Sequence, residues 1–443
     1  MKNILVLGAG KSATALIEYL LEHAATYEWN ITVGDMDPEI AAQKINGHTH
    51  GNAIFFDVKD LELLRQTVAT HDIVASVLPA EFHYRVAQAC IEFGKHLITP
   101  SYVSAREREL DNEFREKGLL FMGEIGLDPG IDHMSVMRIL HYIASENGKL
   151  NALRSFCGAL IAPESDDNPW HYKFTWAPMN VVLAGQGTAQ FLENGKIRYV
   201  PYNRLFSQVQ RYEVEGYGTF EGYPNRDSLP YIQVYGVEGV RTFMRGTLRR
   251  GGYCAAWDAF VKIGLTDNNL LIKDVNDKCY SDLLSAFLPA DPKRNLRQRC
   301  ADFLRLPTTA EPLNKMAWLG FFDDEPILLE QGTPAQLLCD LLARKWTLKA
   351  NDKDLIVMLH EFEYETSDAK KHKITSTLAL KGKDQEHTAI ALTVGLPMAI
   401  MVKLVATNQI TLTGVHIPIS PEVYIQMLNE LEELGIGFTE THE

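Results

Sequence analysis

Lys2-Asn3-Ile4-Leu5-Val6-Leu7 is an apolar run that ends in Gly8-Ala9-Gly10-Lys11-Ser12-Ala13, and this stretch decides the fold. Residues at the spacing of an amphipathic helix follow directly, and the next apolar run is Ile31-Thr32-Val33-Gly34-Asp35. A strand, a glycine turn, a helix, a second strand and an acid, in that order, are typical of a dinucleotide-binding βαβ unit. The alternative is an ordinary turn between a strand and a helix of a parallel sheet. The placement of the glycines between two strand patterns favours nucleotide binding.

Each small residue of the turn has a physical role. Gly8 allows a tight turn off the strand, Gly10 lets the backbone approach a pyrophosphate, and Ala13 lets the helix pack closely on the sheet. The first N–H groups of a helix have no partner within it, so they attract phosphate oxygens. The residues expected to contact a dinucleotide in this turn are Gly8, Ala9, Gly10, Lys11 and Ser12.

The acid at the end of the second strand bears on the choice of cofactor. A carboxylate there accepts hydrogen bonds from a ribose 2′-hydroxyl and repels a 2′-phosphate. No arginine follows Asp35, since the next residues are Met36 and Asp37. The pattern therefore favours NAD over NADP, with Asp35 and Met36 among the cofactor contacts. Alternatively, Asp35 or Asp37 only caps the next helix, because Asp37-Pro38-Glu39 is also a plausible helix start.

Composition and charge argue against several classes of protein. The chain has 443 residues and a net charge of -14, and its pI is near 5.5, so we expect no nucleic-acid or membrane partner. Six scattered cysteines without a C-x-x-C pair predict a reduced, cytoplasmic setting with neither a disulfide framework nor a metal site. Because the chain begins with a strand pattern, we expect no signal peptide. The longest apolar stretch, 389–402, predicts a buried core helix, because glycine and proline interrupt it.

Alternating strand and helix patterns continue to about residue 130. The predicted strands after the first unit are 52–58, 72–79, 96–100 and 119–124, with helices between them. This alternation predicts an α/β fold with a Rossmann-type doubly wound parallel sheet. In such sheets ligands lie beyond the carboxyl ends of the strands. Further cofactor contacts are expected at that edge, from Asp57, Val58, Val77, Leu78 and Asp128.

A change in the pattern after about residue 150 predicts two further domains. Residues 152–260 carry aromatics, glycines and short alternating runs such as Tyr231-Ile232-Gln233-Val234-Tyr235, which predict an antiparallel sheet. Residues 266–348 contain helical patterns such as Leu270-Leu271-Ile272, and strand patterns return at 354–360 and 373–380. The expected domains are a dinucleotide-binding domain of 1–130 plus 388–443, an α+β substrate domain of 131–264 plus 350–387, and a small helical domain of 265–349.

Several long and unusual strings resemble those of one known family. They are Gly123-Glu124-Ile125-Gly126-Leu127-Asp128-Pro129-Gly130-Ile131-Asp132-His133 and the segments 163–169, 172–176, 223–228, 245–249, 354–360 and 395–397. Over essentially its whole length the chain resembles the L-glutamate-forming saccharopine dehydrogenases. The resemblance implies an oxidoreductase of lysine metabolism. Such an enzyme interconverts saccharopine with L-glutamate and 2-aminoadipate 6-semialdehyde, through an imine and with NAD or NADP.

The resemblance also implies roles for individual residues. Saccharopine carries three carboxylates, and the planar fork of arginine binds carboxylates bidentately. The residues matched to substrate binding are Ser101, Tyr102, Cys157, Arg226, Thr247, Leu248 and Arg249, and those matched to the nicotinamide end of the cofactor are Asp128 and Trp176. Asp128 and Tyr102 are the candidates for proton transfer, with Cys157 and His133 as weaker ones. Asp128 could instead only nucleate its turn, Tyr102 could only cover the end of the sheet, and Trp176 could be an ordinary core residue.

Some points stay open at the level of sequence. Relatives mostly lack an acid at the position of Asp35 and use NADP, so the resemblance and the local electrostatics disagree on the cofactor. The alternating strands of the middle domain suggest a homodimer. One alternative function is reduction of a different imine, as in carboxynorspermidine dehydrogenase, although the arginines favour a polycarboxylate. The other is a non-catalytic, nucleotide-sensing relative.

Overall fold

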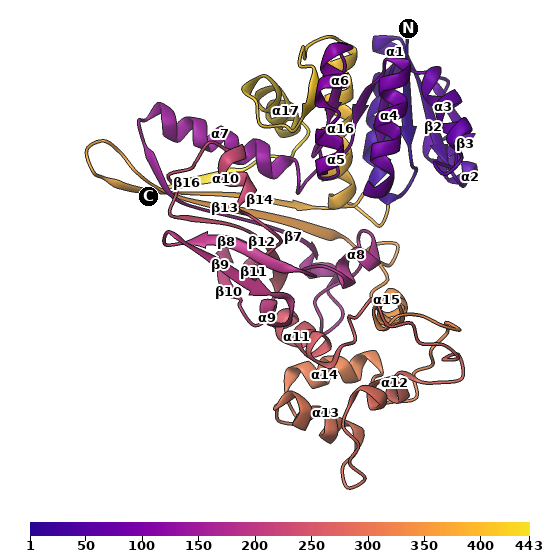
Figure 1. The fold of residues 1–443 in the computed structure, drawn as a ribbon, viewed down its shortest axis with the longest axis vertical. Coiled ribbons are helices and arrows are strands. Elements are labelled where there is room, and N and C mark those ends of the chain that lie inside the picture. Colours follow the sequence, from indigo (N-terminus) through magenta and orange to yellow (C-terminus); the bar gives the residue numbers. More distant parts are fainter. The chain divides into compact units, whose positions relative to one another are not determined.

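The computed structural model describes all 443 residues, which form two compact units (Figure 1). The first unit consists of Met1–Lys149 and Leu380–Thr439, and the second of Leu150–Ala379 and Glu440–Glu443. The first unit extends beyond residue 130 because helix α7 (Ile131–Ser145) packs on α17 (Pro421–Glu433), where His141 Nδ1 lies 2.5 Å from the Tyr424 hydroxyl. Residues 265–349 belong to the second unit, because their apolar side chains share one core with its sheet.

A seven-stranded sheet forms the centre of the first unit. Its strand order is β15-β6-β5-β4-β1-β2-β3, and every neighbouring pair is parallel. The strands are β1 (Lys2–Leu7), β2 (Trp29–Asp35), β3 (Gly51–Phe55), β4 (Ile73–Ser76), β5 (His96–Ile98), β6 (Leu120–Met122) and β15 (Gly414–His416). The order 3-2-1-4-5-6 with one added strand is the Rossmann topology, which confirms the predicted doubly wound sheet. Strand β15 was not predicted, because its three residues carry no recognisable pattern.

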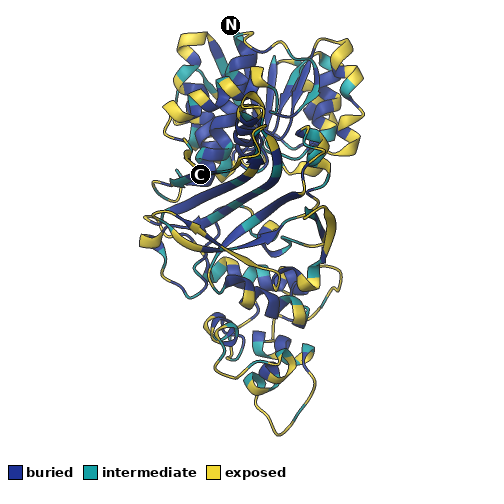
Figure 2. Ribbon diagram, turned by 90° about the vertical axis from the view of Figure 1, so that its left-hand side faces the viewer, coloured by how far each residue is buried: buried dark blue, intermediate teal, exposed yellow.

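Helices pack on this sheet, and most of them bury one side and expose the other (Figure 2). They are α1 (Thr14–Tyr27), α2 (Pro38–Ile45), α3 (Leu61–Ala69), α4 (His83–Phe93), α5 (Ala105–Arg108), α6 (Asp111–Glu116), α7, α16 (Ala389–Ala406) and α17. Helix α1 buries Leu16, Ile17, Leu20 and Leu21, which recur at helical spacing, as expected of the amphipathic helix after the glycine turn. Side-chain caps set the starts of several helices; the Asp60 carboxylate, for example, accepts from the N–H groups of Glu62 and Leu63.

Helix α16 is long and apolar enough, with a mean hydropathy of 2.1, to pass for a membrane span by composition. However, 83% of it is buried inside the protein, as the prediction of a core helix requires. Its glycine is needed for close packing against α1. A Cβ atom on Gly395 would lie 2.7 Å from the backbone nitrogen of Leu16, so the two helices could not approach this closely with a larger residue.

A nine-stranded sheet forms the second unit. Seven strands follow the order β10-β11-β12-β7-β13-β14-β16, β8 pairs with β12, and β9 pairs with β8. The strands are β7 (Lys149–Ile161), β8 (Thr188–Glu193), β9 (Lys196–Pro201), β10 (Gln210–Val214), β11 (Gly218–Pro224), β12 (Thr242–Arg250), β13 (Asp354–Glu365), β14 (Lys371–Lys381) and β16 (Thr439–His442). The predicted antiparallel pairing is present between β10 and β11, β11 and β12, β12 and β8, and β8 and β9. The sheet is nevertheless mixed, because β12 pairs with β7 in parallel. Residues 162–241 separate these two strands and supply the antiparallel hairpins β8–β9 and β10–β11.

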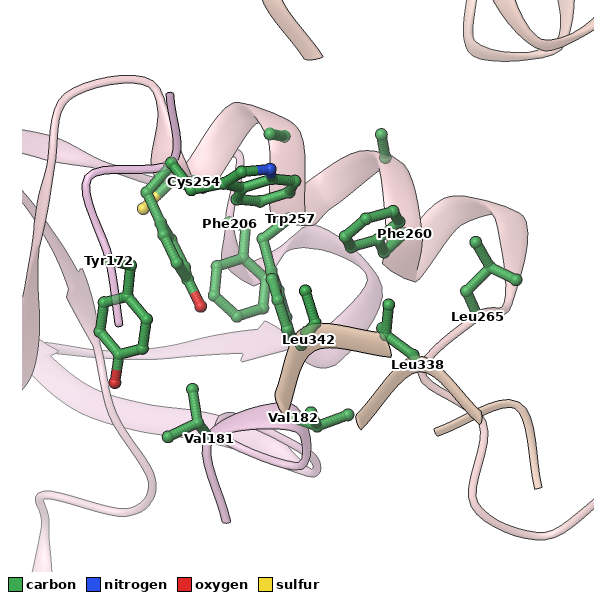
Figure 3. Packing of buried hydrophobic residues seen from close by; sticks show 14 of the residues in the cluster. Tyr172, Val181, Val182, Phe206, Cys254, Trp257, Phe260, Leu265, Leu338 and Leu342 are labelled. Carbon is green, nitrogen blue, oxygen red and sulfur yellow. The ribbon is translucent and has the colours of Figure 1, made fainter. Parts of the chain in front are cut away.

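Helices complete the second unit, and all of them except the short helix 230–234 contribute side chains to its apolar core. They are α8 (Pro178–Val182), α9 (Tyr202–Leu205), α10 (Pro230–Val234), α11 (Tyr253–Ile263), α12 (Tyr280–Phe287), α13 (Leu296–Leu304), α14 (Glu311–Leu319) and α15 (Pro334–Lys345). Figure 3 shows Trp257 and Phe260 of α11 near Leu338 and Leu342 of α15, all within this core. Both α11 and α15 bury the apolar side chains that helical spacing brings to one side.

Two local predictions in the second unit were wrong. Residues 231–234 of the alternating run lie in the short helix α10, which begins with Pro230, and Tyr235 is its C-cap residue. The prediction failed because a run of five residues is too short to identify a strand by its period. Leu270-Leu271-Ile272 is not helical: the Asp267 carboxylate accepts from the N–H groups of Asn269 and Leu270 and forms a turn. Leu270 and Leu271 are consequently exposed.

Candidate active site

The glycine turn of the first unit leaves open space next to its backbone. Gly8 has a φ of +97°, and a Cβ atom there would lie 3.1 Å from Val77 Cγ2. A Cβ atom on Gly10 would meet no protein atom within 4 Å. No side chain caps the 3₁₀ turn Lys11–Ala13 or helix α1 behind it. The turn thus fits a phosphate group, which requires both free space and uncapped N–H groups.

Asp35 is bonded to the glycine turn. Its Oδ2 accepts from the Ala9 N–H at 2.7 Å, and its Oδ1 accepts from the Asp37 N–H at 2.9 Å. Asp37, not Asp35, caps helix α2, where its carboxylate accepts from the Glu39 N–H at 3.0 Å. The Asp35 side chain is half-buried, so it keeps one open side. It combines a fixed negative charge with the position expected for a ribose-binding acid.

The other predicted cofactor residues follow the carboxyl ends of neighbouring strands. Asp57 lies after β3 and accepts from the Lys59 N–H at 2.9 Å, and Val77 lies after β4 and donates its N–H to the Leu7 carbonyl at 2.9 Å. Leu78 is half-buried, Met36 is 65% exposed and Val58 is buried. The sheet order places all of these segments near the end of β1. Their contact with a cofactor stays a prediction.

The two candidates for proton transfer contact each other. The Tyr102 hydroxyl donates to Asp128 Oδ1 at 3.0 Å, although 26 positions separate the residues. Both side chains are half-buried, as is the neighbouring Ser101. Tyr102 follows β5, and Asp128 belongs to the Gly126–Gly130 loop after β6. A phenol and a carboxylate in hydrogen-bond contact can pass a proton between them.

Arg249 in the second unit is a buried cation without an acidic partner. Its side chain is 4% exposed, and its guanidinium lies 5.3 Å from the ring centres of both Tyr172 and Tyr253. One nitrogen donates to the Leu248 carbonyl at 3.0 Å, whereas Nε has no hydrogen-bond partner. Because burying an unpaired charge is costly, this arrangement suits the binding of a carboxylate ligand.

Three strands bring further predicted residues next to Arg249. Thr247 on β12 is the register partner of Cys157 on β7 and of Tyr223 on β11. Tyr223 is 1% exposed, and burial raises its pKa to about 12. Its hydroxyl therefore stays protonated at neutral pH and can act as a hydrogen-bond donor. Thr247 and Cys157 are only partly buried.

The remaining candidates for substrate and cofactor binding lie in surroundings that differ from one residue to the next. Arg226 is exposed, with a φ of +54°, and its carbonyl accepts from the Gln190 N–H. The Leu248 side chain lies in the apolar core, so only its main chain is available for a ligand. Trp176 is half-buried and packs against that core, and its indole N–H has no hydrogen-bond partner. The Arg245 guanidinium lies 4.2 Å from the centre of the Tyr231 ring.

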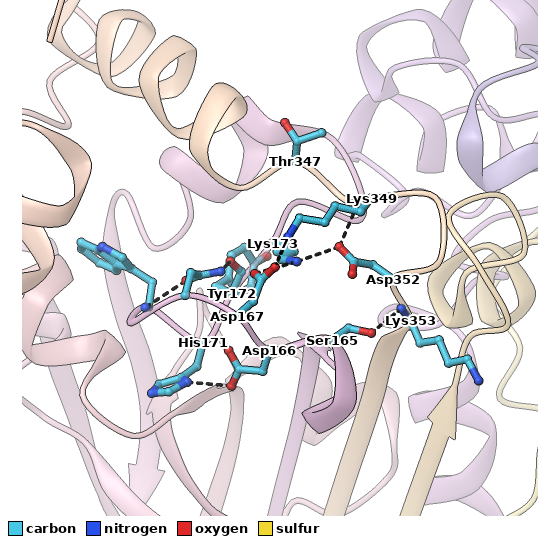
Figure 4. Close-up of polar contacts among 12 residues, drawn as sticks. Ser165, Asp166, Asp167, His171, Tyr172, Lys173, Thr347, Lys349, Asp352 and Lys353 are labelled. Atoms are coloured by element: carbon cyan, nitrogen blue, oxygen red, sulfur yellow. Dashed lines mark hydrogen bonds and ion pairs between the residues drawn. The ribbon is translucent and has the colours of Figure 1, made fainter.

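A buried ion-pair network holds the loop that carries Tyr172 (Figure 4). Lys173 is 2% exposed, and its Nζ lies 2.7 Å from Asp352 Oδ2 and 2.8 Å from Asp167 Oδ1. Asp352 also accepts from the Lys349 N–H at 2.8 Å. Hydrogen bonds from Lys173 and Lys349 lower the pKa of Asp167. The network thereby orients Tyr172 next to Arg249.

Sequence reasoning missed several residues near Arg249 and near the pair Tyr102 and Asp128. Tyr172, Tyr223 and Tyr253 surround Arg249, but no role was predicted for them from the sequence. Glu124 lies at the end of β6 with 1% exposure and a φ of +55°. Glu124 lies within the family string 123–133, but no role of its own was predicted for it from the sequence.

Two family models match the chain. The model described as "Saccharopine dehydrogenase NADP binding domain" matches residues 4–122, and "Saccharopine dehydrogenase C-terminal domain" matches residues 126–436. A solved structure, apo histidine-tagged saccharopine dehydrogenase (L-Glu forming) from Saccharomyces cerevisiae, has a TM-score of 0.90 and 31% identity, with each chain covered over 100%.

Curated relatives are similar over the whole chain. "Saccharopine dehydrogenase [NADP(+), L-glutamate-forming]" of Schizosaccharomyces pombe is 31% identical, with 99% of each chain covered. The protein of the same name from Saccharomyces cerevisiae is 33% identical, over 98% of this chain and 97% of the relative. The mitochondrial alpha-aminoadipic semialdehyde synthase of Bos taurus is 33% identical over 99% of this chain, which spans only 47% of that longer protein.

Proposed function

Because the chain belongs to the saccharopine dehydrogenase family, we propose that it interconverts saccharopine with L-glutamate and 2-aminoadipate 6-semialdehyde. The observation that carries this proposal is Arg249, a buried guanidinium that has no acid of its own and lies among three tyrosines. A substrate with three carboxylates supplies the charge that this arginine lacks. Arg226 and Thr247 are the other proposed carboxylate contacts.

The nicotinamide cofactor supplies or accepts the hydride. Oxidation of saccharopine turns the C–N single bond into an imine, water adds to the imine carbon, and cleavage of the C–N bond releases amine and aldehyde. Protons must leave the water and reach the departing nitrogen. Asp128 can accept a proton as a carboxylate, and Tyr102, whose hydroxyl donates to it, can pass protons on.

We propose NAD as the preferred cofactor. The names of the fungal relatives and of the family model contain NADP, which favours the phosphorylated cofactor. In this chain, however, the Asp35 carboxylate lies at the end of β2, bonded to the glycine turn, and it would repel a 2′-phosphate. The deciding experiment is kcat/KM measured with NAD and with NADP at the same saturating saccharopine concentration. A higher value with NADP would overturn the preference.

The activity is tested directly by spectrophotometry. Purified protein, saccharopine and NAD should produce the absorbance of the reduced cofactor, and glutamate plus the semialdehyde should consume it in the reverse direction. A saccharopine analogue with one carboxylate amidated is the matched control, and it should react more slowly. Absence of turnover with both cofactors in both directions would contradict the proposal. A homodimer and a cytoplasmic location stay predictions.

A further inference from the structure

Glu124 contacts the chain on both sides of Tyr102. Its own N–H donates to the carbonyl of Ser101 at 3.0 Å. Its Oε1 accepts from the N–H of Val103 at 3.1 Å. The residues before and after Tyr102 are thus bonded to the same glutamate, which leaves the Tyr102 backbone little freedom to move.

The second carboxylate oxygen of Glu124 reaches the segment that follows Asp128. Its Oε2 lies 2.9 Å from His133 Nε2, and His133 is in the first turn of α7. That turn is bonded back to the loop that carries Asp128. The Ile131 N–H donates to the Gly126 carbonyl at 2.9 Å, and Asp132 Oδ1 accepts from the Gly130 N–H at 2.7 Å. A single side chain therefore connects the Tyr102 segment with the Asp128 loop.

Burial and charge strengthen this connection. Glu124 is 1% exposed and His133 is 0% exposed. Burial alone raises the pKa of Glu124, but the hydrogen bond and charge of His133, the Val103 N–H and Arg108, 3.5 Å away, together hold that pKa below its usual range. Glu124 is thus a carboxylate at neutral pH, and His133 Nε2 donates to it. Hydrogen bonds to a charged acceptor in a buried site are strong.

Glu124 also has a backbone conformation that side chains rarely adopt. Its φ of +55° lies in the left-handed region, which is unfavourable for residues other than glycine. Strained residues of this kind occur where the surroundings demand them, often at functional sites. Here the conformation lets the N–H and the carboxylate of one residue bind the two neighbours of Tyr102.

From these contacts we infer that Glu124, held by His133, is a positioning residue that sets the contact between Tyr102 and Asp128. The inference rests on the proposed roles of Tyr102 and Asp128 in proton transfer. It assigns His133 to the support of Glu124 rather than to proton transfer with the substrate. The competing interpretation is an ordinary buried ion pair that stabilises the fold and has no effect on the rate.

A double-mutant cycle tests the inference on the full-length protein. Glu124→Ala should lower kcat about 100-fold, the scale expected when reacting groups are slightly misplaced. In an Asp128→Asn or Tyr102→Phe background, the same change should cost less than about threefold, because residues that act together are not additive. Equal losses in all three backgrounds would overturn the inference.

Conservative variants separate positioning from direct proton transfer. The amide of Glu124→Gln still accepts from the Val103 N–H, so this variant should be at least about tenfold faster than Glu124→Ala. The pH dependence of kcat should also keep its midpoints. A Glu124→Gln variant as slow as Glu124→Ala would mean that Glu124 itself transfers the proton, and this would contradict the inference. Cofactor binding, followed by quenching of tryptophan fluorescence, should change less than about twofold.

Two control variants measure the effect of losing a partly buried polar contact elsewhere in the same unit. Glu430→Ala removes the carboxylate that contacts Lys403 and Tyr19. His141→Ala, on helix α7, removes the imidazole that contacts the Tyr424 hydroxyl. Both should lower the melting temperature and leave kcat unchanged. If Glu124→Ala behaves like these controls, the positioning role is wrong. If Asp128→Asn and Tyr102→Phe alone retain full activity, the proposed proton transfer fails instead.

Discussion

Single residues of the glycine turn and of β2 make separable contributions to cofactor binding. Gly8 has a conformation that other residues rarely adopt, Gly10 provides space, and Asp35 provides charge. The charge and the turn are not independent, because Asp35 accepts a hydrogen bond from Ala9 within the turn. Substitutions at these positions should therefore have different signatures.

Gly10→Ala should impair cofactor binding without destabilising the fold. The added methyl group meets no protein atom within 4 Å, so the melting temperature should be unchanged. It occupies the space where a phosphate would approach, and KM for the cofactor should rise about tenfold or more. Calorimetry and steady-state kinetics on the same preparation check both statements. A drop in melting temperature would show that the open space has a structural role.

Asp35→Ala should reduce the preference for NAD. The change removes the carboxylate that repels a 2′-phosphate, so kcat/KM with NADP should rise relative to NAD by about tenfold. The change also removes the acceptor of the Ala9 N–H. The variant should consequently bind either cofactor less tightly than the wild type binds NAD. Kinetics with both cofactors measure the ratio. An unchanged ratio would exclude Asp35 from cofactor selection.

Arg226→Ala should raise KM for saccharopine at least about tenfold, the cost of removing one partner of a charged pair. Cofactor affinity should stay the same. Arg305→Ala is the matched control, because Arg305 is also exposed and also has a left-handed φ, +56°. Equal loss of saccharopine and cofactor affinity in Arg226→Ala would assign that arginine a structural role.

At the scale of elements, helix α16 shows how a distant segment completes the nucleotide-binding unit. Its apolar run was recognisable as a core helix, and it packs against α1 directly behind the glycine turn. The pairing itself could not be seen in the sequence, because α16 begins 362 positions after α1 ends (389 − 27). Only the close approach at Gly395 identifies where they cross.

Gly395→Ala should destabilise the first unit. The new Cβ would lie 2.7 Å from the Leu16 nitrogen and 3.2 Å from Ala15 Cβ. The helices would have to move apart, at a cost of about 1–3 kcal/mol. The melting temperature should fall, whereas Gly251→Ala, whose methyl group meets no atom within 4 Å, is the control without a clash. Equal stability of both variants would contradict this packing.

At the scale of the whole molecule, buried histidines should make the protein sensitive to acid. Burial lowers the pKa of His83 to about 4 and lowers those of His71 and His96 as well. The unfolded chain protonates histidine near its ordinary pKa of about 6.5. The unfolded state therefore binds more protons between these values, and stability falls as the pH drops from about 6.5 to about 4.

His83→Gln should make this loss of stability shallower. His83 alone accounts for up to roughly 3 kcal/mol over that pH range. Urea unfolding of both proteins at several pH values measures the slope, and the exposed His442→Gln provides the control. The same slope in wild type and His83→Gln would mean that other groups cause the acid sensitivity.

Sequence alone determined the nucleotide-binding βαβ unit, the core helix and the identity of the charged candidates. These features depend on residue spacing within one segment, and that spacing reflects local backbone geometry. Short segments such as β15 and the run 231–235 contain too few residues for the spacing of their apolar side chains to distinguish a strand from a helix.

Only the tertiary structure decided which candidates touch each other. Strand order brings Tyr102 next to Asp128 and places tyrosines around Arg249. It also brings Glu124 into contact with the residues on both sides of Tyr102. Sequence spacing carries no record of such contacts, because they depend on which strands become neighbours and on how each side chain is buried.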